Sequence, residues 1–116
     1  MRLITLSPQF LKLDILPGEN PAAANHHHVV SDINNADGIW FLCPKCYMDG
    51  GMTGKGVHSI ICWTPKVSTE VNPKPGRWNL VGTNFRDISL VAGSSSILLN
   101  GGCNAHFWIR DGEIIF

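Results

Sequence analysis

The sequence GGCNAHFWIR at residues 101–110 combines two metal-binding side chains with the alternating pattern of a β-strand. Cys103 and His106 stand at a C-x2-H spacing, and a second pair, Cys43 and Cys46, stands far upstream at a C-x2-C spacing. Three thiolates and one imidazole suit tetrahedral Zn²⁺ in a closed structural site. We therefore predict that Cys43, Cys46, Cys103 and His106 bind one zinc ion, which would join the middle of the chain to its last hairpin.

Other interpretations of these residues stay open at the level of sequence. A buried cysteine packs like a small hydrophobic residue, and His106 could be an ordinary core histidine. Cys62 could replace one of the four ligands, with His58 close to it in sequence, but its apolar neighbours favour a buried thiol. The run His26–His28 lies in a polar segment, where histidines are usually solvated or bind metal adventitiously.

Length and composition predict one small domain in a reducing compartment. The chain has 116 residues and a formal net charge of zero, so residues 1–116 fit a single domain without a basic surface for nucleic acid or membranes. No apolar run is long enough to span a bilayer, and the first residues are too short and mixed for a signal peptide. We therefore expect the cysteines to be cytoplasmic thiols or metal ligands rather than disulfides.

Short strands separated by turn residues dominate the rest of the pattern. The strongest signal is a hairpin of residues 106–110 and 113–116, because Asp111-Gly112 supplies the positive φ angles of a type I′ turn. The other predicted strands are residues 10–16, 38–42, 57–63, 77–81, 88–91 and 96–99. This pattern predicts an all-β fold, a small antiparallel sandwich or partly open barrel clasped by one structural zinc.

Known catalytic motifs are absent from the sequence, and we predict no catalytic or cofactor-binding residue. The chain lacks the H-x-E of zinc deaminases, the H-E-x-x-H of zinc proteases and a phosphate-binding glycine loop. Ser94-Ser95-Ser96 lacks the setting of a nucleophile elbow, whereas a nucleophilic pair of Cys62 and His58 stays open. Four good ligands would also fill the zinc shell, and a catalytic zinc keeps one position for water.

Several motifs of the chain resemble one family. They are F-x-C-P-x-C at residues 41–46, H-S-I-x-x-W at 58–63, P-G-R-W at 75–78, the serine-rich segment at 94–98 and G-G-C-x-A-H-F-x-I-R-x-G-x-I at 101–114. Together they resemble a family of small β domains of unestablished function from bacteriophages and bacteria. The resemblance extends from about Phe10 to Ile114 and is most specific from Cys103 onward.

The resemblance implies a zinc-binding β domain with Cys43, Cys46, Cys103 and His106 at the matching positions. Related domains are encoded beside bacterial ubiquitin-like conjugation genes. Some members carry the name ammonia monooxygenase, which implies no activity here because that enzyme is a membrane copper protein.

Taken together, these patterns favour a zinc-stabilised protein-binding module of phage origin, acting on a host or phage protein in the host cytoplasm. Docking would use an exposed β edge or the long loops at residues 17–37 and 64–76, and the same edge could join two copies. The alternative is a small zinc-dependent hydrolase in which His58 or one of His26–His28 acts as acid or base. A nucleic-acid-binding zinc domain is a third expectation, which the neutral charge disfavours.

Overall fold

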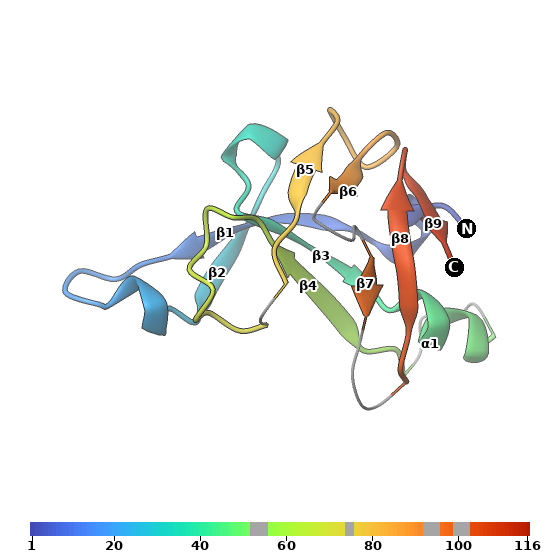
Figure 1. Ribbon diagram of the computed structural model, residues 1–116, viewed down its shortest axis with the longest axis horizontal. Helices are drawn as coiled ribbons and strands as arrows, with labels where there is room; N and C mark the ends of the chain where they lie inside the picture. Colours follow the sequence, from blue (N-terminus) through green and yellow to red (C-terminus); the bar gives the residue numbers. More distant parts are fainter. Residues whose placement is uncertain (52–55, 74–75, 92–95, 99–102) are drawn as a thin grey trace.

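The computed structural model describes residues 1–51, 56–73, 76–91, 96–98 and 103–116. Within them the strands form three antiparallel sheets, with the orders β2-β1-β3-β4, β5-β6 and β7-β8-β9 (Figure 1). The strands are β1 (Gln9–Asp14), β2 (His26–Val30), β3 (Gly38–Leu42), β4 (Ser59–Trp63), β5 (Asn79–Val81), β6 (Ser89–Val91), β7 (Ile97–Leu98), β8 (His106–Arg110) and β9 (Glu113–Ile115). The helices are the 3₁₀ turns η1 (Leu3–Leu6), η2 (Pro21–Ala23) and η3 (Ile33–Asn35), and the α-helix α1 (Pro44–Asp49). The predicted all-β class is confirmed, and the sheets do not close into a barrel.

The four-stranded sheet buries its two faces in different ways. Partners in an antiparallel pair point to the same face, so the pairs of Ile39 with Phe10 and with Cys62 put these three side chains on one face. This face packs into the main core, which we define as the buried residues Leu3, Leu6, Phe10, Ala36, Ile39, Phe41, Cys43, Ile60, Cys62, Ile88, Leu90, Ile97, Ala105, Phe107, Ile109 and Ile114. The opposite face carries the second core, defined as Leu11, Trp63, Val67 and Val71.

The second core is covered by a loop rather than by a sheet. Residues 64–73, which we call the 64–73 loop, fold back so that Val67 and Val71 are buried against Trp63. The Trp63 indole Nε1 donates to the Asn72 carbonyl at 2.9 Å. Residues 64–73 are a loop, as predicted for 64–76, but it is anchored by buried side chains; residues 74–75 lie outside the described part of the chain.

One arginine ties this loop together through backbone carbonyls. The Arg77 guanidinium donates to carbonyl oxygens on either side of the loop. Its acceptors are Val67 at 3.1 Å, Pro73 at 2.9 Å, Gly76 at 2.7 Å, Ser68 at 2.5 Å and Val71 at 2.7 Å. Burial lowers the pKa of Arg77, but a guanidinium keeps its charge in proteins. These bonds are therefore charge-assisted.

The segment at residues 17–37, predicted as a long polar loop broken at most by a short strand at Val29-Val30, contains the edge strand β2 (His26–Val30). Its pairing with β1 runs from Phe10–Val30 to Asp14–His26. Strand patterns are recognised by alternating apolar residues, and β2 is mostly polar because most of its side chains are exposed. The predicted strand at residues 10–16 ends earlier, at Asp14, and Ile15 and Leu16 are exposed beyond it.

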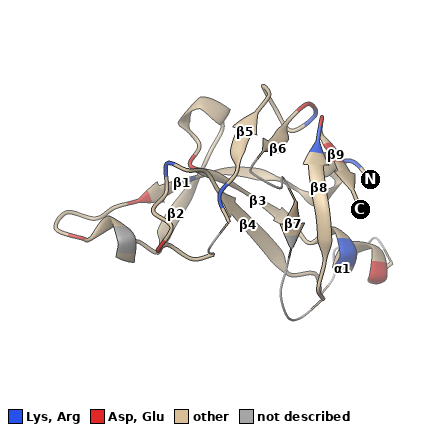
Figure 2. Ribbon diagram, in the orientation of Figure 1, with Lys and Arg blue, Asp and Glu red and all other residues tan. Residues whose placement is uncertain are grey.

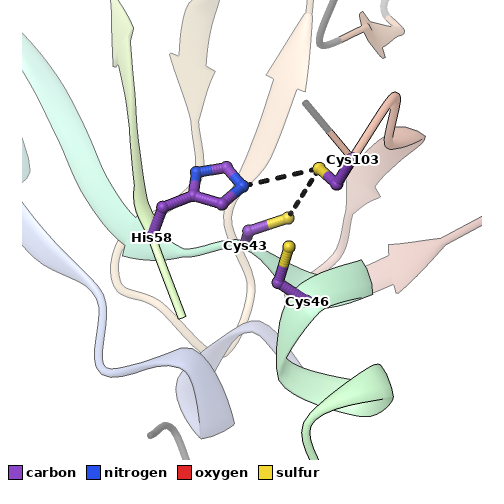
Figure 3. Close-up of side chains that lie close together, drawn as sticks. All are labelled: Cys43, Cys46, His58 and Cys103. Carbon is purple, nitrogen blue, oxygen red and sulfur yellow. Dashed lines mark hydrogen bonds between the residues drawn. The ribbon is translucent and has the colours of Figure 1, made fainter. Parts of the chain in front are cut away.

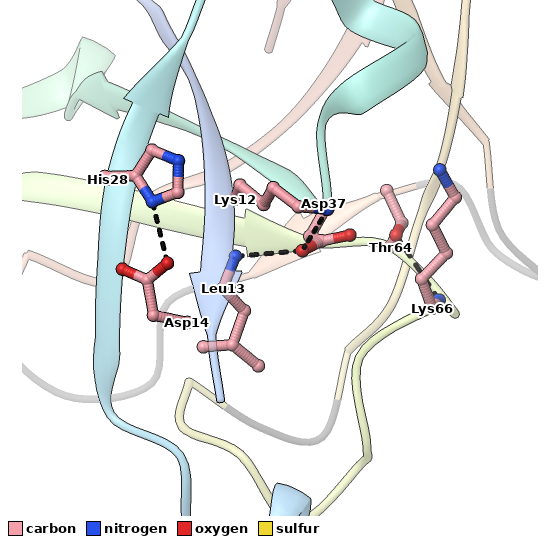
Figure 4. A network of polar contacts seen from close by, with 7 residues as sticks. All are labelled: Lys12, Leu13, Asp14, His28, Asp37, Thr64 and Lys66. Atoms are coloured by element: carbon pink, nitrogen blue, oxygen red, sulfur yellow. Dashed lines mark hydrogen bonds and ion pairs between the residues drawn. The ribbon is translucent and has the colours of Figure 1, made fainter. Parts of the chain in front are cut away.

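Asp37 continues the hydrogen bonding of β1 past its last pair with β3. Its Oδ2 accepts from the Leu13 backbone N–H at 2.9 Å and lies 3.9 Å from Lys12 Nζ (Figure 4). The Asp37 carbonyl accepts from the Thr64 N–H at 2.7 Å. This residue therefore links β1 to the start of the 64–73 loop.

The predicted C-terminal hairpin is confirmed as β8 and β9. Asp111 and Gly112 both have positive φ angles, 49° and 75°, as a type I′ turn requires. Gly112 also lies so close to the Arg86 carbonyl that a Cβ would stand 2.2 Å from its oxygen. Its N–H donates to Ile88 at 2.8 Å and its carbonyl accepts from Leu3 at 2.8 Å, so the turn joins three parts of the main core.

Candidate metal site

The side chains of Cys43, Cys46, His58 and Cys103 converge at one end of the four-stranded sheet (Figure 3). We call them the Cys3His group; their ligand atoms all lie within 4.8 Å of one another. The Sγ atoms of Cys43 and Cys103 are 3.6 Å apart, and His58 Nε2 is 3.4 Å from Cys103 Sγ. A zinc tetrahedron with ordinary bond lengths has S–S edges of about 3.8 Å and N–S edges of about 3.5 Å. The group therefore matches the size of a tetrahedral metal site.

Strand β3 and helix α1 deliver the first two cysteines. Cys43 is the N-cap of α1, and Pro44 occupies the first turn, where its fixed φ suits a helix. Cys46 follows three residues later, so both thiols lie on one side of the helix. The chain after Leu42 therefore continues as a short helix. The Gly50 N–H closes it on the Cys46 carbonyl at 2.9 Å.

The pairing of β3 with β4 delivers His58. The last pair in the register is Leu42 with Ser59, which makes Cys43 and His58 the next pair outward. The Cys43 N–H does donate to the His58 carbonyl, at 2.9 Å. The ladder therefore sets the imidazole directly across from the first thiol. The sequence indicates both strands, but only the observed register of residues 38–42 with 59–63 places His58 there.

Cys103 comes from the segment that leads into β8. Asn104 has a positive φ of 52°, which turns the chain between the cysteine and the strand. The Lys45 ammonium donates to the Cys103 carbonyl at 2.6 Å and so ties this segment to α1. It also places a positive charge next to the backbone of Cys103. Gly101 and Gly102 lie outside the described residues.

His106, the fourth ligand predicted from the sequence, is not brought to the three cysteines. It is the first residue of β8, where Ala105 and Phe107 on either side are buried. Strand alternation therefore sends His106 to the exposed face, and its ring lies 4.9 Å from that of Trp108. The C-x2-H spacing favoured His106, but the positive φ at Asn104 and the strand that follows separate it from Cys103.

The other candidate residues lie elsewhere. Cys62 is 1% exposed within the main core, which confirms the buried-thiol interpretation, and burial raises its pKa. His26–His28 form the start of β2, at the end of the molecule away from α1 (Figure 1). Ser94 and Ser95 lie outside the described residues.

The three thiols of the group differ in acidity. Desolvation raises the pKa of Cys43, and it raises that of Cys46 to about 12 together with the neighbouring Cys103 and Cys43 thiols. Desolvation also opposes ionisation of Cys103, but the His58 ring and the Ala105 backbone amide outweigh it and lower the pKa to about 7. Cys103 is therefore the most acidic thiol. A bound divalent cation would deprotonate all three, because only the thiolate is a metal ligand.

The chain finds no match among protein-family models, curated proteins or solved structures. Among the helices described, none combines the length and apolar character needed to cross a membrane. Function is therefore inferred from the Cys3His group and from the surfaces of the sheets.

Proposed function

We propose that this chain is a small β domain stabilised by one zinc ion at Cys43, Cys46, His58 and Cys103, and that it works as a protein-binding module. The carrying observation is the match between the two measured ligand–ligand distances, 3.6 Å and 3.4 Å, and the edges of a zinc tetrahedron.

The chemistry of the group favours a structural zinc over other metals and other roles. Thiolates are soft ligands that select zinc over magnesium or calcium, which prefer oxygen. Three thiolates around Zn²⁺ leave one negative charge, which the Lys45 ammonium on the Cys103 carbonyl offsets. Four protein ligands also fill the coordination shell, so no position is left for a catalytic water.

The position of the group explains how it would stabilise the domain. Cys43 and Cys103 are 60 residues apart, and the metal would join β3, α1, the start of β4 and the segment before β8. A cross-link over such a long loop removes many conformations from the unfolded chain. The hydrolase alternative is weaker, because His58 would be a ligand and not a free acid or base.

A free sheet edge and exposed apolar residues support the protein-binding part of the proposal. β2 is an edge strand, and such an edge can pair with a strand of another protein. Ile15, Leu16 and Val29 at the same hairpin are 52%, 50% and 56% exposed. In the ribbon of Figure 2, Lys and Arg positions are separated along the described chain and mixed with Asp and Glu positions, which disfavours nucleic acid as the partner.

The nature of the partner is proposed from the sequence. The motif resemblance suggests a phage origin and hence a host or phage protein in the host cytoplasm, where thiols remain reduced. Pairing of two copies through β2 would use the same edge.

Substitution of cobalt for zinc tests the metal site. Co²⁺ bound to the wild type should give the intense visible bands of tetrahedral cobalt and a thiolate-to-cobalt charge-transfer band. His58→Ala should weaken the tetrahedral bands, because water would replace the imidazole. His106→Ala is the matched control and should leave the spectrum unchanged. A spectrum that depends on His106 and not on His58 would refute the proposed ligand set.

Charge placed on the edge strand tests the binding surface. Val29→Lys adds a charge to β2, whereas Val81→Lys adds the same charge to β5 at a residue of almost equal exposure, 54% against 56%. A partner recovered from lysate with the wild type and with Val81→Lys, but not with Val29→Lys, would support edge pairing. Equal recovery with both variants would place the contact elsewhere.

A further inference from the structure

Two histidines of β2 share one face of the edge strand with a carboxylate of β1. Side chains two residues apart in a strand point to the same face, so His26 and His28 lie together and His27 lies on the other face. Asp14 is the register partner of His26, which places it on the face of His26 and His28. Its Oδ1 is also 2.8 Å from His28 Nδ1 (Figure 4).

The Asp14 contact determines which nitrogen of the His28 ring is available to bind a metal ion. With Nδ1–H donating to the carboxylate, Nε2 becomes the acceptor nitrogen of the ring, the arrangement found where a carboxylate orients a metal-binding histidine. The ring is exposed, and so is that of His26. Alternate residues of a strand stand roughly 7 Å apart at the backbone, a span that two imidazoles can close around one ion.

We propose that His26 and His28 form a second metal site, which binds one divalent ion such as Ni²⁺, Cu²⁺ or Zn²⁺ through their ring nitrogens, with Asp14 orienting His28. Imidazole is a suitable ligand for these three metals. The site differs from the Cys3His group because it has two protein ligands on an exposed strand. Water fills the remaining positions, so the ion is exchangeable.

The neighbouring charges are compatible with a cation at this place. Lys12 is the register partner of His28 and shares its face, but its ammonium is directed to Asp37 at 3.9 Å, on the β3 side of β1 (Figure 4). Asp14 adds a negative charge beside the ring. His27 contacts the second core instead, with its ring centroid 6.1 Å from that of Trp63.

Calorimetric titration with NiCl₂, on full-length protein already loaded with zinc, tests the proposal. The wild type should bind one Ni²⁺ per chain that the variant carrying His26→Ala and His28→Ala does not bind. His27→Ala is the matched control and should bind as the wild type does. Asp14→Asn should weaken binding about tenfold, the lower end of the usual effect of an outer-shell partner.

Two readouts keep the result interpretable. Zinc content measured before and after titration shows whether Ni²⁺ has displaced the ion of the Cys3His group, and circular dichroism shows whether the variants stay folded. In NMR spectra, Ni²⁺ should broaden the ring signals of His26 and His28 before those of His58 and His106. Binding that persists in the double variant, or that is lost equally in His27→Ala, would overturn the proposal.

Discussion

The main core and the second core lie on opposite faces of the four-stranded sheet, and different kinds of side-chain contact hold the segments around them together. At one end of the sheet the Cys3His group gathers four side chains from separate parts of the chain, all within 4.8 Å. On the second core, the Arg77 guanidinium donates to several backbone carbonyls of the 64–73 loop. Both join segments that lie far apart in the sequence or lack regular structure.

The difference lies in what each cross-link requires of the sequence. A metal site needs a specific side chain at every ligand position, so the loss of one ligand weakens the whole site. Arg77 needs only carbonyl groups, which every residue provides. Side chains contribute to this loop through the buried Val67 and Val71 and through the hydroxyls of Thr64 and Ser68, which accept from backbone N–H groups of the loop. We expect the metal cross-link to contribute more to stability, and three measurements test this ranking.

Loss of the Cys43 thiolate should lower the stability of the domain the most. Structural zinc binding contributes about 10–16 kcal/mol in small zinc domains, so an even share among four ligands gives about 2.5–4 kcal/mol for one. Cys43→Ser should therefore lower Tm by roughly 10 °C or more, since 1 kcal/mol corresponds to about 4 °C at this size. A chelator in excess should destabilise the wild type at least as much. Thermal melts followed by circular dichroism measure both effects.

Cys62→Ala is the control for this measurement. It also removes a buried thiol, but from the main core and not from the Cys3His group. It should lower Tm by a few degrees and leave the zinc content and the response to chelator unchanged. If the wild type melted at the same temperature with and without chelator, the metal would make no contribution to the stability of the domain.

The Cys3His group could be predicted in part from the sequence, whereas the contacts of Arg77 could not. Cys43, Cys46 and Cys103 could be selected because cysteines paired with a second ligand at a short spacing are typical of zinc sites. His58 was missed because its place depends on the pairing of β3 with β4, which is a tertiary property. Arg77 belongs to the P-G-R-W motif, but the motif does not indicate its acceptors, because these are backbone atoms whose positions only the folded loop defines.

The same reasoning explains the errors in secondary structure. The β8–β9 hairpin was predicted correctly because Asp111-Gly112 determines a local turn. β2 was mostly missed because it pairs through its backbone while its histidines face solvent. Local chemistry thus predicts turns and strands with a buried face, and it fails for edge strands and for loops whose partners lie far away in sequence.

Removal of the Arg77 guanidinium should lower the free energy of unfolding by an intermediate amount. The structural change should be confined to the face of the sheet that carries the second core. Arg77→Ala deprives several carbonyls of their donor, and we expect a loss of about 2–3 kcal/mol, in the range for hydrogen bonds to charged groups. Arg77→Lys should not restore it, because an ammonium cannot reproduce the planar fork of donors. Urea denaturation of zinc-loaded protein measures the loss.

Proteolysis shows where the Arg77 variant opens. Lys66 is exposed within the 64–73 loop, so trypsin should cleave after it faster in Arg77→Ala than in the wild type, while zinc stays bound. Loss of zinc in parallel would contradict the separation of the two faces, because it would mean that the two cross-links open as one unit.

The smallest effect is expected for an exposed carboxylate that closes the turn between β5 and β6. Asp87 accepts from the Thr83 hydroxyl at 2.6 Å and from the Thr83 and Asn84 N–H groups at 2.9 Å each. The Thr83 hydroxyl, followed by the backbone N–H groups, lowers its pKa from 3.8 to about 2. Because the folded pKa lies below the unfolded one, the stabilisation is complete above about pH 4 and is lost as pH falls towards 2.

Comparison of Asp87→Asn with the wild type isolates this contribution from the acid release of zinc, which both proteins share. The difference between their urea midpoints should be small and constant from pH 7 to pH 5, and it should shrink below pH 4. It should also stay below the difference caused by Arg77→Ala, because solvent screens an exposed carboxylate more strongly than a half-buried guanidinium. If Asp87→Asn lowered the free energy of unfolding as much as Arg77→Ala does, burial would not determine the order of these contributions to stability.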